Sequence, residues 1–183
     1  MQQHALHVFE TALGHCGMSW TAQGLAGVQL PEGSETATRR RLHRRFPGGA
    51  IRPLDGEAAT LAATLMDTLA GHARSLDDIV LDLRDVPPFA QRVYQVARSI
   101  PRGSTLTYGE VAARLGDPQL AREVGRALGA NPFPIVVPCH RVLGTGSLGG
   151  FSAHGGAATK RRLLLLEGTP GVQLSMFDDP GER

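Results

Sequence analysis

The side chains best suited to chemistry lie in one proline-rich segment, Asn131-Pro-Phe-Pro-Ile-Val-Val-Pro-Cys-His-Arg-Val142. Its apolar run Ile135–Val137 predicts a short strand, and the flanking prolines predict that this strand ends abruptly at Cys139. Cysteine is often a small buried hydrophobe, but His140 and Arg141 follow this one directly and are costly to bury. Because a neighbouring imidazole and a cation lower the pKa of a thiol, the segment favours a nucleophilic cysteine.

Cys16 is a weaker candidate for a functional site than Cys139. His15 adjoins it and His4 and His7 lie nearby, but their spacing matches no metal-ligand pattern, so we expect an incidental thiol and no metal site. Two cysteines this far apart cannot form a disulfide framework, which favours a reducing, cytoplasmic compartment. The first residues lack a signal-peptide pattern, and no apolar run approaches the roughly 18 residues that cross a bilayer.

Two short helices in a helix-turn-helix pattern precede the cysteine segment. Thr107 and Glu110 have capping-box spacing for a helix to about Leu115, and Asp117-Pro118 begins a second helix that runs to about Gly129. The second helix has an inward stripe and a stripe of small residues beside two arginines: Leu120, Val124 and Leu128, then Ala121, Gly125 and Gly129 with Arg122 and Arg126. Close helix packing and DNA docking explain the small residues equally well; the arginines favour DNA.

The remaining elements suggest a small α/β unit followed by helices. The predicted elements are a hairpin of residues 18–22 and 25–30, a helix over 34–46, a helix with an apolar stripe at Ala58, Leu61, Leu65 and Leu69, a strand with Ile79, Leu81 and Leu83, a helix with Phe89, Val93, Ala97 and Ile100 on one face, and a final helix over 158–167. The 34–46 helix carries five arginines, which favour a solvated face over nucleic-acid contact.

Charge is distributed unevenly along the 183 residues. The overall formal charge is only +2, which excludes a histone-like basic coat and an acidic tail-type binder. Residues 1–85 carry 8 basic and 10 acidic side chains, whereas residues 86–168 carry 10 basic and 4 acidic ones. A polyanion such as DNA should therefore bind the second half. The composition changes at Asp85-Val86-Pro87-Pro88, where we place a domain boundary that gives units 1–86 and 87–168 and a tail 169–183.

The cysteine segment and its surroundings resemble a known family. Pro138-Cys-His-Arg-Val142, Asn131-Pro132, Gly150-Phe-Ser152 and the stretch from Lys160 to Leu-Glu-Gly168 are similar to the methylated-DNA–protein-cysteine methyltransferases, or O6-alkylguanine-DNA alkyltransferases. The likeness is dense from about residue 88 to 168 and weak before it. It implies an N-terminal α/β domain of ribonuclease-H-like fold, with a small β-sheet and helices, joined to a mainly α C-terminal domain with a winged-helix-like helix-turn-helix.

The resemblance also implies roles for individual residues. Cys139 would accept the alkyl group irreversibly in a single turnover, with His140 as its general base through a water and Glu167 orienting the imidazole. Asn131 would brace the turn before the cysteine. Tyr108 would donate to the leaving guanine. The base pocket would contain Tyr108, Pro134, Val142, Phe151 and Ser152, and DNA would contact Thr107, Tyr108, Ala121, Arg122 and Gly125.

These roles amount to direct reversal of alkylation damage at O6 of guanine, and less readily at O4 of thymine. The implied partner is double-stranded DNA bound through its minor groove by a monomer, with the damaged base flipped out and Arg122 filling its place in the stack. No cofactor and no metal are implied. In a bacterium the protein would lie in the cytoplasm near the nucleoid.

Two positions depart from the family pattern and two rival functions stay open. Phe151 lacks the hydroxyl of the tyrosine found in some members, and Glu123 places a negative charge beside Arg122, which weakens phosphate contact unless an arginine pairs with it. One rival is a DNA-damage sensor or helix-turn-helix regulator without alkyl transfer. The other is a cysteine hydrolase, which is disfavoured because adjacent Cys and His side chains in an extended segment point to opposite sides.

The tail beyond residue 168 has no helical or strand periodicity, and we expect it to be disordered. Its segment Gln173-Leu174-Ser175-Met176-Phe177 resembles the peptides that bind the bacterial replication sliding clamp, with Met176 and Phe177 as apolar anchors. A chance match is the more frequent explanation of so short a motif. Three apolar side chains within four residues of an exposed tail nevertheless favour a partner.

Overall fold

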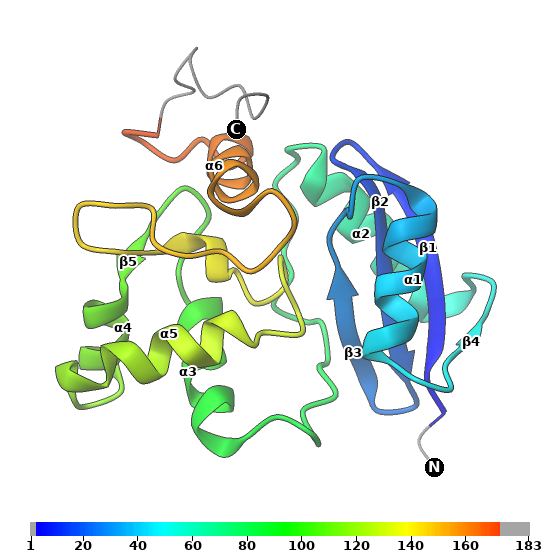
Figure 1. The fold of residues 1–183 in the computed structure, drawn as a ribbon, viewed down its shortest axis with the longest axis horizontal. Helices are drawn as coiled ribbons and strands as arrows, with labels where there is room; N and C mark the ends of the chain where they lie inside the picture. Colours follow the sequence, from blue (N-terminus) through cyan, green and yellow to red (C-terminus); the bar gives the residue numbers. More distant parts are fainter. Residues whose placement is uncertain (1–2, 173–183) are drawn as a thin grey trace.

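A small sheet with two helices and a group of helices lie side by side in the computed structural model, which describes residues 3–172 (Figure 1). The sheet is formed by the first part of the chain, and the helices after residue 87 form the other part. This agrees with the expected α/β N-terminal and helical C-terminal organisation. Within the described residues, no helix is long and apolar enough to cross a membrane.

Four strands form the sheet, in the order β3-β2-β1-β4. Strands β1 (Ala5–Thr11), β2 (Gly14–Thr21) and β3 (Gly24–Gln29) are antiparallel neighbours, and the short β4 (Ala50–Ile51) pairs parallel with β1. The predicted hairpin is thus confirmed as β2 and β3. Strand β1 was not predicted, because its buried residues Leu6 and Phe9 lie on opposite faces and give no alternating pattern.

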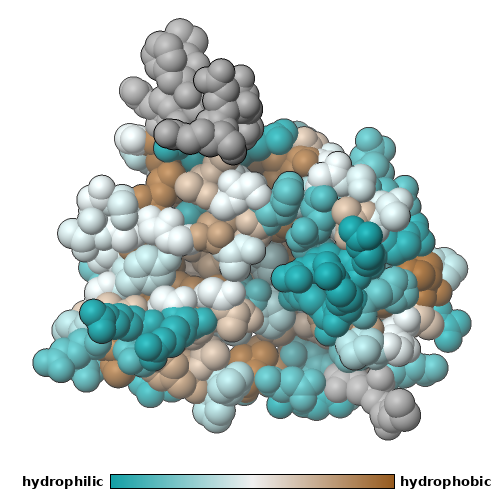
Figure 2. Space-filling model, viewed as in Figure 1, coloured by the Kyte–Doolittle hydropathy of each residue, from teal (hydrophilic) through white to brown (hydrophobic). Residues whose placement is uncertain are grey.

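Helices cover both faces of this sheet. Helix α1 (Glu35–Arg45) begins at Ser34, whose hydroxyl accepts a hydrogen bond from the Ala37 amide, and it buries Leu42 against Leu6. Helix α2 (Gly56–Leu69) packs the apolar stripe predicted from its sequence against the other face: Ala58, Leu65 and Leu69 are buried and Leu61 is partly buried. Four of the five α1 arginines are exposed and only Arg45 is partly buried; Figure 2 shows hydrophilic side chains gathered over this helix.

The predicted strand at Ile79, Leu81 and Leu83 is wrong. This stretch is irregular, and only Leu81 forms an isolated bridge, to Leu25. The buried Asp82 side chain binds Arg84 and accepts a hydrogen bond from the Thr21 hydroxyl. Gly24 permits the close approach of this segment, because a Cβ at its φ of +126° would lie 2.5 Å from the Val80 carbonyl oxygen.

The helical part consists of short elements, and its helices lie near their predicted positions. They are α3 (Pro88–Arg98), β5 (Leu106–Thr107), α4 (Tyr108–Arg114), the 3-10 turn η1 (Pro118–Leu120), α5 (Ala121–Gly129), the 3-10 turn η2 (Cys139–Arg141), β6 (Val142–Leu143) and α6 (Gly156–Leu166). Strands β5 and β6 pair in parallel. The capping box predicted at Thr107 and Glu110 is present, and the Asp117 carboxylate caps η1. The buried Tyr94 hydroxyl donates to the Ala127 carbonyl 3.0 Å away and ties α3 to α5.

The two parts share a core and a set of polar links. Buried apolar residues of the sheet, α2 and the helical part form one continuous cluster. Across the junction, the Val28 amide donates to the Pro132 carbonyl oxygen at 2.8 Å, and the Arg45 guanidinium donates to the carbonyls of Val28 and Pro132. Gly27 allows this close contact, because a Cβ there would lie 2.5 Å from Phe46 Cζ and 3.0 Å from the Pro132 oxygen.

We therefore expect Gly27→Val to lower the free energy of unfolding by about 1–3 kcal/mol, the usual cost of overpacking, measured by urea denaturation. Gly109→Ala in α4 is the matched control, because a Cβ there meets only ordinary van der Waals contact and alanine favours a helix. Equal stability of the Gly27 variant and the wild type would contradict this account of the junction.

Candidate active site and nucleic-acid interface

The segment before Cys139 is a tight turn and not the predicted strand. Ile135 has φ +77°, which a β-branched residue adopts only when its surroundings enforce it. The Asn131 amide enforces it from both ends: Oδ1 accepts from the Phe133 amide and Nδ2 donates to the Val137 carbonyl, each at 2.9 Å. The bracing role expected of Asn131 is thus visible in these bonds, and the turn presents Cys139 at the start of η2.

Behind the cysteine, η2 places His140 inside the protein. Successive residues of a 3-10 turn point about 120° apart, so Cys139 and His140 do not face opposite ways as in a strand. The His140 ring is 2% exposed, and its Nε2 lies 2.9 Å from Oε1 of Glu167. Arg141 also turns to Glu167, with bonds of 2.9 and 2.8 Å to the two carboxylate oxygens.

These bonds determine the protonation of the buried pair. Burial raises the pKa of Glu167, but hydrogen bonds from His140 and Arg141 outweigh it and hold that pKa at about 2. Burial lowers the pKa of His140 despite its bond to Glu167, so the imidazole is neutral at neutral pH. Because an ionised carboxylate only accepts, Nε2 carries the ring proton. The Nδ1 lone pair is therefore free, and this buried atom has no hydrogen-bond partner among residues 3–172.

The expected lowering of the thiol pKa by His140 and Arg141 is wrong. Burial raises the pKa of Cys139, because desolvation disfavours the thiolate. The neutral imidazole cannot oppose this effect, and Arg141 is committed to Glu167. Smaller opposing effects come from a hydrogen bond with Asn131 and from the positive charge of Lys160. The resting thiol is thus protonated and requires a base.

Lys160 is a member of the site that the sequence did not reveal. It is fully buried in α6, and its Nζ donates to the Val142 carbonyl at 2.6 Å and the Gly150 carbonyl at 3.2 Å. The same Nζ lies 5.8 Å from the centre of the Tyr108 ring. Burial lowers its pKa to about 8. Its neighbours Thr159, Arg161 and Arg162 are polar, so no sequence pattern marked this lysine as buried.

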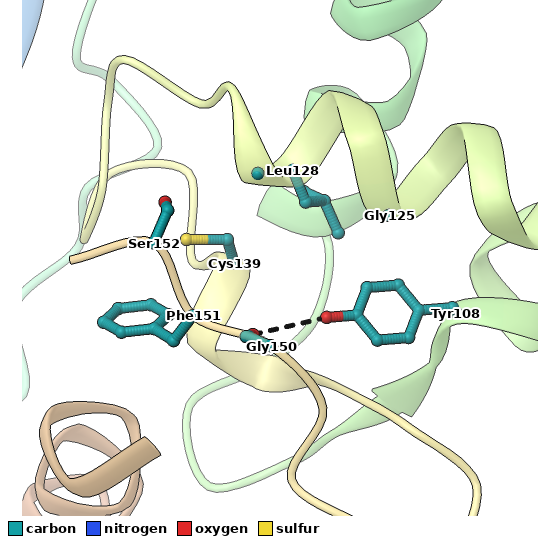
Figure 3. Close-up of a pocket in the computed structure, with 8 residues that line it drawn as sticks. Tyr108, Gly125, Leu128, Cys139, Gly150, Phe151 and Ser152 are labelled. Atoms are coloured by element: carbon teal, nitrogen blue, oxygen red, sulfur yellow. Dashed lines mark hydrogen bonds between the residues drawn. The ribbon is translucent and has the colours of Figure 1, made fainter. Parts of the chain in front are cut away.

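A pocket of about 310 Å³ opens beside the thiol. Its walls come from α4, α5, η2 and the glycine-rich loop: Tyr108, Gly125, Leu128, Gly129, Cys139, Gly150, Phe151 and Ser152. In Figure 3 the sulfur of Cys139 points toward Ser152, while Tyr108 closes the opposite side with its hydroxyl 3.5 Å from the Gly150 carbonyl oxygen. Three residues expected around the base, Tyr108, Phe151 and Ser152, thus surround one cavity. Leu128 was not anticipated there.

Two other residues expected in this pocket lie elsewhere. Val142 is 0% exposed and lies in the core, because β6 pairs with β5 and turns its side chain inward. Only its carbonyl oxygen takes part, as an acceptor for Lys160. Pro134 lines a neighbouring hollow that meets the pocket at Cys139. Gly149 permits the close approach of its loop to Tyr108, because a Cβ there would lie 2.9 Å from the Tyr108 ring.

The helix-turn-helix carries the residues expected to meet DNA. Val124 and Leu128 of α5 are buried, whereas Arg122 is exposed and Ala121 and Gly125 are partly exposed. A Cβ on Gly125 would lie 3.9 Å from the Tyr108 ring, so α5 passes directly over the pocket. Glu123 pairs with Arg126 at 3.6 Å, which leaves Arg122 available to another partner. Thr107 is committed to capping α4.

Metal-ligating residues do not gather in residues 3–172: no group of three or more His, Cys, Asp or Glu side chains is placed to hold an ion. Cys16 is buried beside the Thr11 hydroxyl, and burial raises the pKa of its thiol to about 11. The sliding-clamp motif at Gln173, Leu174, Met176 and Phe177 lies outside the described residues.

Comparison with known proteins places this geometry in a family. Residues 88–169 match the model of the 6-O-methylguanine DNA methyltransferase DNA-binding domain. A methylated-DNA–protein-cysteine methyltransferase of Methanothermobacter thermautotrophicus is 39% identical over 153 residues, which span 83% of this chain and 78% of that protein. The chain belongs to the methylated-DNA–protein-cysteine methyltransferase family. A Mycobacterium bovis member is 48% identical over 103 residues, 55% of this chain and 61% of that protein.

Solved structures of the methyltransferase family share the fold. A crystal structure of Mycobacterium tuberculosis OGT in complex with DNA has a TM-score of 0.74 and 33% identity, covering 89% of this chain and 92% of that one. The O6-methylguanine-DNA methyltransferase of Pyrococcus kodakaraensis has a TM-score of 0.69 and 25% identity, covering 91% and 100%. Both likenesses extend through the sheet as well as the helical part.

The ionised Glu167 should make the stability of this methyltransferase pH-dependent. Since its pKa of about 2 lies below its ordinary value near 4.5, its contribution is present above about pH 4.5 and is lost as the pH falls toward 2. Glu167→Gln should therefore lower the free energy of unfolding by about 3–5 kcal/mol at pH 7, the usual cost of breaking a buried pair. The difference should shrink as the pH falls to 3.

Urea denaturation of both proteins between pH 7 and pH 3 checks this prediction. Asp82, whose pKa is also lowered by Arg84, is present in both proteins and cancels in the comparison. A difference that stays constant with pH would show that Glu167 contributes by packing and not by charge.

Proposed function

We propose that the protein repairs DNA by direct reversal of alkylation, transferring the alkyl group of O6-alkylguanine to Cys139. The observation that carries this proposal is the arrangement around one thiol: a cavity in front of it and a neutral imidazole, oriented by an ionised carboxylate, behind it. The curated relatives bear the name of this activity. O4-methylthymine is the secondary substrate, since it presents the same alkylated oxygen.

The residues supply each part of a single displacement. Nδ1 of His140 takes the thiol proton through a water, and the positive charge of Lys160 stabilises the thiolate that forms. Sγ then attacks the alkyl carbon, the bond from that carbon to O6 breaks, and the electron pair remains on guanine, which takes up a proton. The product is a thioether with no route back, so each molecule acts once and uses no cofactor.

The pocket walls orient the base. Tyr108 lies across the cavity from the sulfur and donates a hydrogen bond or proton to the departing guanine. Burial and the nearby Cys139 charge raise the pKa of Tyr108, which keeps its hydroxyl protonated and able to donate. Ser152 contributes a second hydroxyl beside the flipped base, and the ring of Phe151 supplies an apolar wall.

DNA reaches this pocket by base flipping, because an alkylated base inside a duplex is out of reach of the thiol. Helix α5 enters the minor groove with Ala121 and Gly125 toward the backbone, and a monomer suffices. Arg122 occupies the space left by the flipped nucleotide. This placement is supported by the exposure of Arg122 and by the position of α5 over the pocket.

The finer fold assignments belong to the same proposal. A ribonuclease-H-like description of residues 1–86 is supported by the sheet order β3-β2-β1-β4 with a parallel β4. A winged-helix-like description of residues 87–168 is supported by α4, α5 and the β5-β6 pair. The cytoplasm, and the nucleoid if the organism is bacterial, is the location that this activity requires.

The first test is intact-mass analysis after mixing the protein with duplex DNA containing one O6-methylguanine. We expect the gain of one methyl group, confined to the peptide that contains Cys139. Cys139→Ser should abolish transfer and leave DNA binding nearly unchanged, because a hydroxyl is similar in size but a much poorer nucleophile.

Binding without any methyl gain would instead support the damage sensor, the alternative function. Turnover of an ester or peptide by the wild type would support a cysteine hydrolase. Methyl transfer by the Cys139→Ser variant would remove Cys139 as the acceptor.

Arg122→Ala should slow transfer from duplex DNA at least about tenfold more than transfer from free O6-methylguanine base, because only the duplex requires extrusion. Single-turnover rates on both substrates measure this ratio. Arg126→Ala is the matched control on the same helix, since Arg126 already pairs with Glu123. Equal losses on both substrates would refute the role of Arg122 in flipping.

The tail motif remains a prediction from the sequence. A sliding clamp would recruit this single-use protein to newly replicated DNA through Gln173, Leu174, Met176 and Phe177. Calorimetry of the full chain with purified bacterial clamp should detect binding that the double change Met176→Ala and Phe177→Ala abolishes. No association at high micromolar protein would end the hypothesis.

A further inference from the structure

A second hollow, of about 240 Å³, meets the base pocket at the thiol. The two cavities share Cys139, Gly129, Phe151 and Ser152. The far wall of the second hollow comes from the other part of the protein, from β3, the segment after it and α1: Val28, Gln29, Leu30, Glu32, Arg41 and Arg45. The reactive sulfur therefore borders two cavities, and the proposed repair of methylated guanine uses only one.

Three charged side chains line this hollow, and two of them are already satisfied. Arg45 donates to the carbonyls of Val28 and Pro132 and to Oε1 of Gln29. Glu32 accepts a hydrogen bond from Nε2 of Gln29 at 2.9 Å. Arg41 is exposed and makes no hydrogen bond or ion pair with any residue from 3 to 172. The sum of the three charges is positive, and the free guanidinium is its source.

Arg41 lies close enough to the interior of this hollow to affect its neighbour. Burial first, and then the charge of Arg41, lower the pKa of Arg45, whereas the charge of Glu32 raises it. The charges of Arg41 and Glu32 thus both act on Arg45 within this hollow. An anion in the hollow would be attracted by both arginines and repelled by Glu32, with a favourable balance.

The geometry of displacement directs a longer alkyl group sideways. Sγ, the reacting carbon and O6 lie in line, so any further carbons must project away from that line. The sulfur points toward Ser152, a residue shared with the second hollow, while Tyr108 closes the other side (Figure 3). Free space beside the thiol is therefore available toward Arg41.

We propose that the second hollow binds the distal part of alkyl groups longer than methyl, and that Arg41 makes it selective for O6-alkylguanines whose alkyl chain ends in a carboxylate. This inference rests on the proposed function and names a substrate class for the same site. The step is the displacement already described: the bond from Sγ to the first methylene carbon forms and the bond from that carbon to O6 breaks. The carboxylate stays on the chain, and the product is an S-(carboxyalkyl)cysteine.

The experiment compares adducts that differ only in charge. One duplex sequence carries O6-methylguanine, O6-carboxymethylguanine, O6-(3-carboxypropyl)guanine or the neutral amide of either acid. Second-order rate constants under subsaturating single-turnover conditions are measured for each, because an interaction made at the remote end of a substrate appears in that constant. For at least one chain length, the acid should react about tenfold faster than its amide, the usual worth of one charged hydrogen bond.

Arg41→Gln should reduce this acid-to-amide ratio to about one and leave the rate for O6-methylguanine within about twofold of wild type. Arg44→Gln is the matched control, because Arg44 is an exposed arginine of the same helix that does not line the hollow. It should leave the ratio unchanged. Mass analysis should find the carboxyalkyl group on Cys139.

Three results would overturn the inference. The acids could react no faster than their amides at either chain length. The ratio could survive in Arg41→Gln. Arg41→Gln could slow all substrates equally and weaken DNA binding, which would assign Arg41 to a DNA phosphate. Failure of the proposed function itself would differ from all three, because O6-methylguanine would then give no transfer in the wild type.

Discussion

The carboxylate of Glu167 connects the end of α6 to the turn that carries the thiol. It is buried, with 6% of its side chain exposed, and it receives hydrogen bonds from His140 and Arg141 at once. Arg141 continues the connection to the Ile100 carbonyl at the end of α3. A buried carboxylate is tolerated only when its partners satisfy it, so three elements must keep their relative positions for this charge to stay buried. The imidazole orientation behind Cys139 is a consequence of that requirement.

The same interactions explain how a partly buried thiol can be both inert and reactive. Burial holds the pKa of Cys139 above its ordinary value, so the free protein carries a protonated thiol that reacts poorly with other electrophiles. In the proposed reaction, deprotonation depends on Nδ1 of His140, whose availability follows from the bond that Nε2 makes to Glu167.

The sequence predicted best what depends on local patterns. The β2-β3 hairpin, the capping box of α4 and the inward stripe of α5 depend on neighbouring residues and are confirmed. The strand at Ile135–Val137 failed because Asn131 closes the turn by bonds that no hydrophobic pattern records. The predicted lowering of the Cys139 pKa was wrong because burial of the thiol, which no local pattern records, raises that pKa. Contacts between residues far apart in the sequence, such as that of Glu167 with His140, could be predicted only through the family resemblance.

The junction between the two parts explains why the sheet belongs to the site. Pro132 lies in the turn that presents the thiol, and its carbonyl accepts from both the Val28 amide and the Arg45 guanidinium. A strand edge and a helix of the first part thereby fix one end of the turn, while Glu167 fixes η2 from the other part. This anchor adds to the two Asn131 bonds that hold the strained backbone at Ile135, since strain persists only where surrounding contacts hold it. The N-terminal part thus contributes to the position of Cys139 through backbone bonds, without placing a side chain in the base pocket.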